Sequence, residues 1–232
     1  MTSHPAITVG IMNLPEEFAL LAYDDDGAPV TDGTHLNNGL GGAVLLELAL
    51  TGKVDVADKK VVVVDATPTG DSLLDQALAR IVDDKARKPG HWVTKFAKNT
   101  RSDVMDRLAA QGVVRLEKGK VLGLFPRTRY PAAHGVEPSQ ETEARQRMHA
   151  AVTGTGPVEP RTAALCALVA ATDLDKKVFR DLDRRQVKAR LKEIGEGAWA
   201  ATAVKKSIEE IQSAIMIAVI AGTTAGATSG GS

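Results

Sequence analysis

The sequence predicts a mainly α fold, a single helical domain that carries two β-hairpins. Of its 232 residues, 44% are hydrophobic and 25% are charged, so the chain has enough apolar side chains for one large core. The run AVLLELAL at 43–50 is too crowded with apolar residues for an amphipathic helix and predicts a central, buried one. Two other stretches, at 53–64 and 113–125, alternate apolar and polar residues as hairpin strands do.

The first third of the chain predicts two helices, a hairpin and a third helix. A proline and two glutamates at 14–17 favour a helix start, and this helix should stop at the acidic turn closed by Gly27. The central helix follows at about 34–51. After the first hairpin comes the turn PTGDS, in which Asp71 or Ser72 is expected to cap the next helix.

The remainder of the chain predicts helices interrupted by the second hairpin. Residues 91–111 have a helical pattern, either as one helix or as two with a break near 99–102. The second hairpin is expected to turn near EKGK at 117–120, and an irregular connection with three prolines then leads to Ser139. From there the pattern predicts helices only, the last of them at about 198–222.

Charge is distributed unevenly along a chain whose formal net charge is zero. Residues 1–84 hold 14 Asp and Glu against 4 Lys and Arg, whereas residues 85–129 hold 12 Lys and Arg against 3 Asp and Glu. This central basic block is what an anionic partner would meet, be it a lipid head group, a nucleic acid or an acidic protein surface. The alternative is that its cations pair with the acidic first third or are merely solvated.

Residue types that carry chemistry are sparse. The single cysteine, Cys166, lies in an apolar run that suits a buried, reduced thiol in the cytoplasm. The five histidines show no metal-ligand spacing, so no metal site is expected. The glycines at 39–42 lack the spacing of a dinucleotide-binding loop, and no nucleophile elbow nominates a serine. We therefore expect no cofactor and no enzymatic activity.

Lys98 and Arg101 are the candidate functional residues. In a continuous helix over 91–111 these cations would be neighbours on the face opposite the apolar side chains, and hence exposed. With a break, Arg101 would lie in the first turn of a new helix, where free backbone amides and the helix dipole favour an anion. Either geometry gives an anion-binding candidate, against the plainer alternative of two solubilising charges.

Four stretches, in order, resemble the Golgi phosphoprotein 3 family. They are GLGGAVLLELALTGKVDV at 39–56, DATPTGDSLLDQAL at 65–78, KNTRSDVMDRLAAQGVVRLEK at 98–118 and LFPRTRYP at 124–131. The last of these, together with the absence of a long basic amino-terminal tail, makes the chain look like a bacterial relative. The resemblance implies one family domain over residues 14–222, with flexible termini at 1–13 and 223–232.

This resemblance implies a peripheral membrane protein that binds phosphatidylinositol 4-phosphate or another anionic phospholipid, on the inner, cytoplasmic face of a membrane. Lys98 and Arg101 fall on the two basic positions of the family's head-group pocket. The family's pocket also uses a tryptophan and an arginine, and by register Asp32 and Gly41 stand in their places. Because a bidentate arginine is missing and a carboxylate is present, we expect a weaker and less specific anion site.

The family resemblance also implies self-association through the hairpin at 113–125, which makes a homo-oligomer the expected assembly. Two other functions remain open. Two short helices followed by a hairpin with basic residues at its tip are the order of a winged-helix nucleic-acid binder, although Asp103 and Asp106 on the second helix disfavour it. A protein-binding scaffold that has lost lipid binding is the other alternative.

Overall fold

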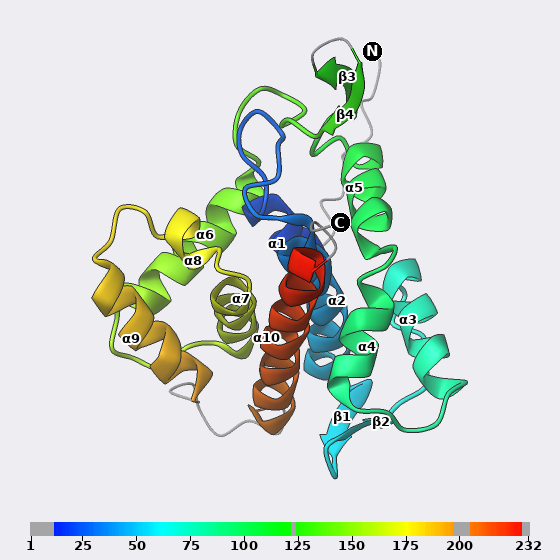
Figure 1. The fold of residues 1–232 in the computed structure, drawn as a ribbon. Coiled ribbons are helices and arrows are strands. Elements are labelled where there is room, and N and C mark those ends of the chain that lie inside the picture. The colour runs from blue at the N-terminus through cyan, green and yellow to red at the C-terminus, as the bar shows by residue number, and fades with distance from the viewer. Residues whose placement is uncertain (1–11, 122–123, 197–204, 229–232) are drawn as a thin grey trace, which may run out of the picture.

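The computed structural model describes residues 12–121, 124–196 and 205–228, and within them the fold is mainly α with two hairpins, as predicted (Figure 1). The helices are α1 (Leu14–Leu21), α2 (Gly33–Leu50), α3 (Ser72–Val82), α4 (Pro89–Phe96), α5 (Thr100–Ala110), α6 (Ser139–Thr153), α7 (Pro160–Ala171), α8 (Asp175–Val178), α9 (Arg184–Gly195) and α10 (Lys205–Thr228). The strands are β1 (Val54–Ala57), β2 (Lys60–Val63), β3 (Glu117–Val121) and β4 (Phe125–Arg129).

α2 is the central element, and α1, α4, α7 and α10 pack around it (Figure 1). Leu45, Leu46 and Leu48 are each 0% exposed, which confirms the prediction of a buried central helix. Its glycines permit the close packing: a Cβ at Gly39 would lie 2.4 Å from the Phe18 ring of α1. Small residues therefore let several helices approach one helix at the same level of the bundle.

α10 runs antiparallel to α2. Gly42 faces the side chain of Ile215, and the Asn38 side-chain amide donates to the Ala218 carbonyl at 3.3 Å. Further along, Gly222 lies against Thr34 in the first turn of α2. The carboxyl-terminal end of α10 consequently lies beside the amino-terminal end of α2.

The first hairpin is confirmed and the second is shifted along the sequence. β1 and β2 pair within the predicted range 53–64, with Val54 against Val63. The second hairpin pairs Glu117 with Arg129 and Val121 with Phe125, so EKGK lies inside β3 and not at the turn. The predicted range 113–125 was therefore wrong, because the second strand is FPRTR, which the sequence analysis assigned to an irregular connection.

The reason for the error is Pro126, which was taken as a sign of irregular structure. It stands opposite Lys120 in β4. A proline cannot donate to a ladder, but in a two-stranded ribbon every strand is an edge strand, where proline is tolerated. Cations stand on both strands of this ribbon, with Lys118 and Lys120 in β3 and Arg127 and Arg129 in β4.

Both ends of the predicted domain are also adjusted. Met12 and Asn13 are buried, and the Asn13 side chain caps α1 by accepting from the Glu16 amide at 3.0 Å, so these two residues are part of the fold. α10 continues to Thr228, so the segment 223–228 is helical where a flexible tail was predicted. Residues 1–11, 197–204 and 229–232, including the predicted start of the last helix, lie outside the described residues.

Acidic residues of α1 and α2 lie in a buried network of ion pairs. Glu17 pairs with Arg147 of α6 at 2.7 Å, and Arg161 of α7 pairs with Glu47 of α2 at 3.1 Å. Glu47 also accepts from the Leu14 amide at the start of α1. Because a buried carboxylate must be paired, these contacts join four helices at one point.

None of the helices, within the described residues, combines the length and the apolar character needed to cross a bilayer.

Candidate anion-binding site

The site begins at a break between α4 and α5. α4 ends at Phe96, residues 97–99 form a turn, and α5 begins at Thr100, so the alternative with two helices is the correct one. The Thr100 hydroxyl donates to the Phe96 carbonyl at 2.6 Å and so stabilises the end of α4. Trp92 of α4 and Leu108 of α5 are both 0% exposed, and the change of direction lets both helices bury their apolar faces.

Lys98 lies in this break and is exposed. Arg101 lies in the first turn of α5 and is half-buried against α1: its Nε donates to the Tyr23 hydroxyl at 2.9 Å, and its guanidinium lies 5.7 Å from the centre of the Tyr23 ring. Tyr130 packs edge-on against the same ring. Arg101 is thereby held by one nitrogen, which leaves its terminal nitrogens as donors for a ligand.

The backbone adds to the positive character of this corner. Asn99 precedes α5, and its side chain makes no cap hydrogen bond among the described residues, whereas Asp71 caps α3 and Asp183 caps α9; the first turn of α5 also holds the carboxylate of Asp103. Uncapped amides and the positive end of the helix dipole favour an anion, and an exposed lysine next to them favours it further. The geometry therefore keeps two cations and a helix terminus together.

The two positions that differ from the expected pocket have different surroundings. Asp32 caps α2 by accepting from the Thr34 amide at 2.8 Å, and its other oxygen contacts His35. Gly41 is buried against α4: a Cβ there would lie 2.3 Å from the Val93 carbonyl oxygen and 2.8 Å from the Ala97 amide nitrogen. Gly41 therefore underlies the turn that holds Lys98, and any side chain at this position would require α4 to move.

Other cations of the basic block fall into two groups. Arg87 and Lys95 pair with Asp84, and Arg107 pairs with Asp71 and Glu16, as the alternative of pairing with the acidic first third predicts. On the hairpin, a depression of about 370 Å³ is bordered by Glu117, which pairs with Arg115, and by four cations to which the described residues offer no ion pair, namely Lys118, Lys120, Arg127 and Arg129. Only part of the block is therefore neutralised within the chain.

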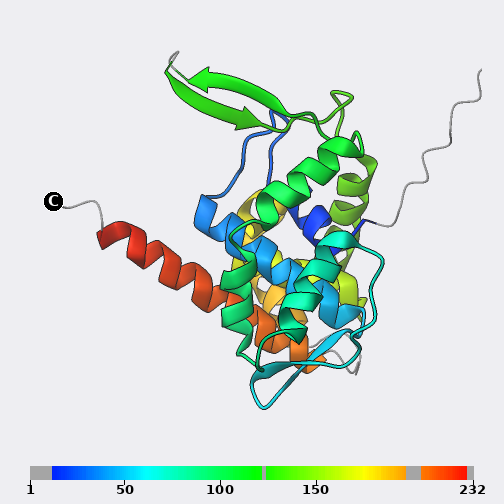
Figure 2. The same ribbon diagram turned by 90° about the vertical axis from the view of Figure 1, so that its right-hand side faces the viewer.

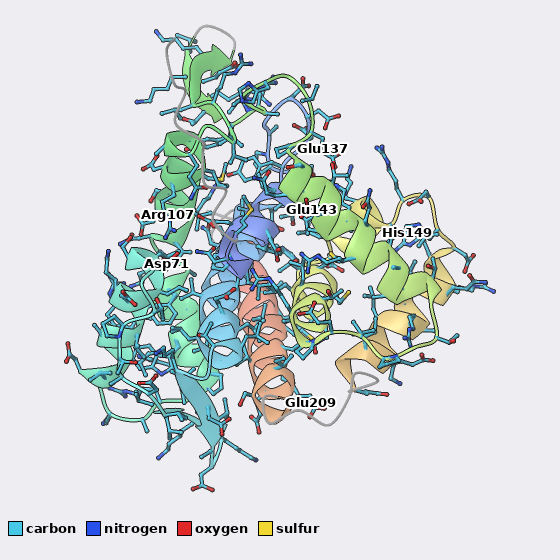
Figure 3. The ribbon with its side chains drawn as sticks, turned by 180° about the vertical axis from the view of Figure 1, so that it is seen from behind. Asp71, Arg107, Glu137, Glu143, His149 and Glu209 are labelled. Carbon is cyan, nitrogen blue, oxygen red and sulfur yellow. The ribbon has the colours of Figure 1, made fainter. Side chains whose placement is uncertain are left out.

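Arg107 is an example of a cation that is neutralised by a carboxylate of the chain. Its guanidinium binds both oxygens of Asp71, at 2.6 and 2.7 Å, and the two side chains point toward one another between α5 and α3 (Figure 3). Burial alone would raise the pKa of Asp71, but the hydrogen bond and charge of Arg107 lower it to about 2. Asp71 also accepts from the Leu73 amide as the cap of α3, which confirms the predicted turn.

An acidic cavity of about 260 Å³ lies next to Tyr23, between the loop after α1 and the start of α6. Asp24, Glu137 and Glu141 line it. Burial raises the pKa of Glu141 to about 7 in spite of its pair with Arg145. The carboxylates that line this cavity disfavour an anion in it.

Metal-ligating side chains do not cluster in the described part of the chain. It contains no group of three or more His, Cys, Asp or Glu side chains placed to hold a metal ion. Cys166 is buried, and desolvation raises the pKa of its thiol to about 12, so the thiol stays protonated and unreactive.

Sequence reasoning missed Tyr23 and the arginines of β4. Tyr23 ends the apolar stretch of α1, and nothing in the sequence indicates that its hydroxyl would meet Arg101, 78 residues away. Arg127 and Arg129, by contrast, alternate with Pro126 and Thr128 in FPRTR, and this period of two was a signal for a strand.

One comparison with known proteins identifies the family. The family model described as Golgi phosphoprotein 3 (GPP34) matches residues 14–211, which is most of the chain and nearly the whole of the predicted domain. The match includes α1 through the first turns of α10, and with them the break that carries Lys98 and Arg101. This chain therefore belongs to the Golgi phosphoprotein 3 family.

Proposed function

We propose that this protein is a peripheral membrane protein that binds anionic phospholipid head groups through Lys98 and Arg101. The observation that carries the proposal is the α4–α5 corner, where an exposed lysine, a half-buried arginine and an uncapped helix terminus lie together in a member of this family. A phosphate group on a membrane surface would accept hydrogen bonds from the free guanidinium nitrogens and from the lysine.

The lipid that the family membership suggests is phosphatidylinositol 4-phosphate. Two features of the chain argue for a broader preference for anionic lipids. Gly41 supplies no guanidinium and is covered by α4, and Asp32 places a carboxylate at the amino-terminal end of α2. We propose that these two residues weaken the discrimination between this lipid and other anionic lipids.

The rest of the proposal concerns location, assembly and chemistry. We place the protein on the cytoplasmic, inner face of a membrane. We also propose self-association through the β3–β4 hairpin, where Leu116 and Leu124 are 45% and 78% exposed. The family is not an enzyme family in general, and we propose a binding role without catalysis for this chain.

The winged-helix alternative has the expected element order, α4, α5 and a basic hairpin. However, the exposed face of α5, which would enter a DNA groove, carries Asp103 and Asp106. Two carboxylates on a recognition helix leave few donors for base edges. Nucleic-acid binding is thus an outcome of the test below and not a second proposal.

The test is vesicle sedimentation with the double variant Lys98→Ala, Arg101→Ala. Each basic residue near an anionic surface contributes about 1 kcal/mol, so the affinity for phosphatidylserine-containing vesicles should fall by roughly tenfold to thirtyfold. Phosphatidylcholine vesicles should bind neither protein. Vesicles that also contain phosphatidylinositol 4-phosphate should show only a small further preference.

The matched control is Arg185→Ala, Lys188→Ala, because this exposed pair on α9 has the same spacing and removes the same charge. It should leave vesicle binding unchanged. If both double variants bind as the wild type does, or if no protein binds at low salt, the head-group role is wrong and a scaffold function becomes the better explanation. Binding to duplex DNA without binding to vesicles would favour the winged-helix alternative.

A further inference from the structure

The carboxyl-terminal half of α10 exposes apolar side chains on one side. Its buried side is formed by Ile211, Ile215 and Val219, which are each at most 5% exposed and face α2 and α7. On the opposite side, Ile217 is 67% exposed and Ile220 is 61% exposed. An amphipathic surface helix would carry polar residues there.

The sequence of α10 shows where the change occurs. Glu209 and Ser213 occupy the outer face in its first turns, and from Ala214 to Ala221 the helix reads AIMIAVIA. No charged residue occurs between Ile211 and Gly222. The described apolar outer face therefore lies in the middle of the helix, at the level where Ala218 contacts Asn38 of α2.

The position of this outer face in the molecule indicates its partner. The end of α10 and the β3–β4 hairpin project from the body on the same side (Figure 2). α2 links them to the candidate site: Asn38 contacts Ala218 of α10, and Gly41, one turn further, contacts Ala97 next to Lys98. The exposed apolar side chains of α10 are thus accompanied by cations at the α4–α5 corner and on the hairpin.

We propose that the exposed apolar side chains of α10, Met216, Ile217 and Ile220, insert into the interfacial layer of an anionic membrane. This inference rests on the proposed function and adds a second point of contact to it. Apolar side chains next to basic ones bind the boundary between head groups and acyl chains. Insertion buries the apolar side chains, and the basic side chains meet lipid phosphates.

A second copy of the chain fits this face less well. Three partly exposed side chains offer on the order of 300 Å² of apolar surface, whereas a stable dimer usually buries about 800 Å² on each partner. A bilayer requires neither a large flat area nor a complementary charge on a protein.

The first experiment removes the apolar surface. The variant Ile217→Ser, Ile220→Ser should bind vesicles of phosphatidylcholine and phosphatidylserine about tenfold more weakly, and binding that persists at high salt should disappear. The matched control is Val64→Ser, Val82→Ser, because these valines are 64% and 48% exposed and lie away from α10. The control should bind as the wild type does, and all three proteins should unfold at similar temperatures.

The second experiment locates the helix relative to the membrane. Cys166 is buried, so Ile217→Cys can be labelled selectively with an environment-sensitive dye, and Ser213→Cys on the same helix provides the control. On mixing with the vesicles, only the dye at position 217 should brighten and be quenched by acyl-chain quenchers.

The outcomes separate this inference from the proposed function. Sedimentation with vesicles without any change of the dye at position 217 would overturn the inference and leave the head-group role standing. A dye that brightens with protein concentration in the absence of lipid would make a second copy the partner and overturn it as well. If the protein does not sediment at all, both are wrong.

Discussion

Arg101 and Arg107 lie less than two turns apart on α5, yet their guanidinium groups have different surroundings. Arg107 binds both oxygens of Asp71 and also contacts Glu16, which is 3% exposed. Among the described residues, the Arg101 guanidinium has Tyr23 as its partner, through its neutral hydroxyl and its ring. The first arginine joins α5 to α1 and α3, whereas the second keeps its charge available.

The two arginines show how a chain with a formal net charge of zero can present a basic surface. The acids of the first third neutralise those cations that lie next to them in the fold, such as Arg107, Arg87 and Lys95. Of the other cations, Lys98 and Arg101 lie at the α4–α5 corner, and Lys118, Lys120, Arg127 and Arg129 lie on the hairpin. Net charge therefore says little about the partner, and the position of each cation relative to buried carboxylates says more.

The strongest test of the difference is Arg107→Ala. Its removal leaves the carboxylates of Asp71 and Glu16 partly buried without their cation, so we expect a loss of about 3 kcal/mol in the free energy of unfolding. Urea denaturation measures this change. Arg101→Ala should cost less than about 1 kcal/mol, because no charged partner is left behind.

Vesicle binding should show the reverse order. At a temperature where both variants are folded, Arg107→Ala should bind as the wild type does and Arg101→Ala should bind more weakly. Equal losses of stability in the two variants would contradict the division of roles between the two ends of α5.

Gly41→Ala tests whether vesicle binding by Lys98 depends on the packing of α2 against α4. The new Cβ would lie 2.3 Å from the Val93 carbonyl oxygen, so α4 must shift, and overpacking of this kind costs about 2 kcal/mol. Since Lys98 follows α4 directly, we expect weaker vesicle binding together with the lower stability. Gly33→Ala on the same helix is the control, because no atom lies within 4 Å of its added Cβ.

Acid titration tests only the ion pair between Arg107 and Asp71. The pKa of Asp71 is lowered from 3.8 to about 2 in the folded chain, chiefly by Arg107 acting against the effect of burial. The unfolded chain therefore takes up the proton first, so the stabilisation is present above about pH 4 and is lost as the pH falls toward 2.

Because Asp71 is 20% exposed, we expect this contribution to be about 1 kcal/mol after solvent screening. Urea midpoints measured from pH 5 to pH 2 should fall more steeply for the wild type than for Arg107→Ala. Parallel curves would show that the ion pair does not set the pKa of Asp71.

Much of the fold was predictable, because it depends on local patterns. The apolar run at 43–50 specified a buried helix, and the cap at Asp71 followed from its place before SLLDQAL. The position of β4 was missed because Pro126 outweighed the alternation around it. Whether a two-stranded ribbon tolerates a proline depends on its free edges, which a linear sequence does not display.

The candidate site was predictable only in its cations. Lys98 and Arg101 stand out in a basic block, and a break in the helix was one of two alternatives. The environment of these two cations was not predictable, because Tyr23 and Gly41 reach this corner through the packing of α1 and α2. Contacts between residues so distant in sequence are decided by tertiary structure and leave no periodic signal.

The smallest expected effect is that of Tyr23→Phe, and it concerns how Arg101 is held. Burial, more than any other influence, raises the pKa of Tyr23, so its hydroxyl stays neutral and accepts from the Arg101 Nε without cancelling the charge. The phenylalanine ring keeps the contact with the guanidinium but offers no acceptor, so Arg101 samples more rotamers. We expect vesicle binding to weaken about twofold, equivalent to roughly 0.4 kcal/mol, because less of the side chain is preorganised for a phosphate. Tyr23→Leu, which also removes the ring, should weaken it further. If Tyr23→Phe binds as tightly as the wild type while Tyr23→Leu does not, the ring and not the hydroxyl holds Arg101, and the two arginines of α5 differ only in whether a carboxylate lies within reach.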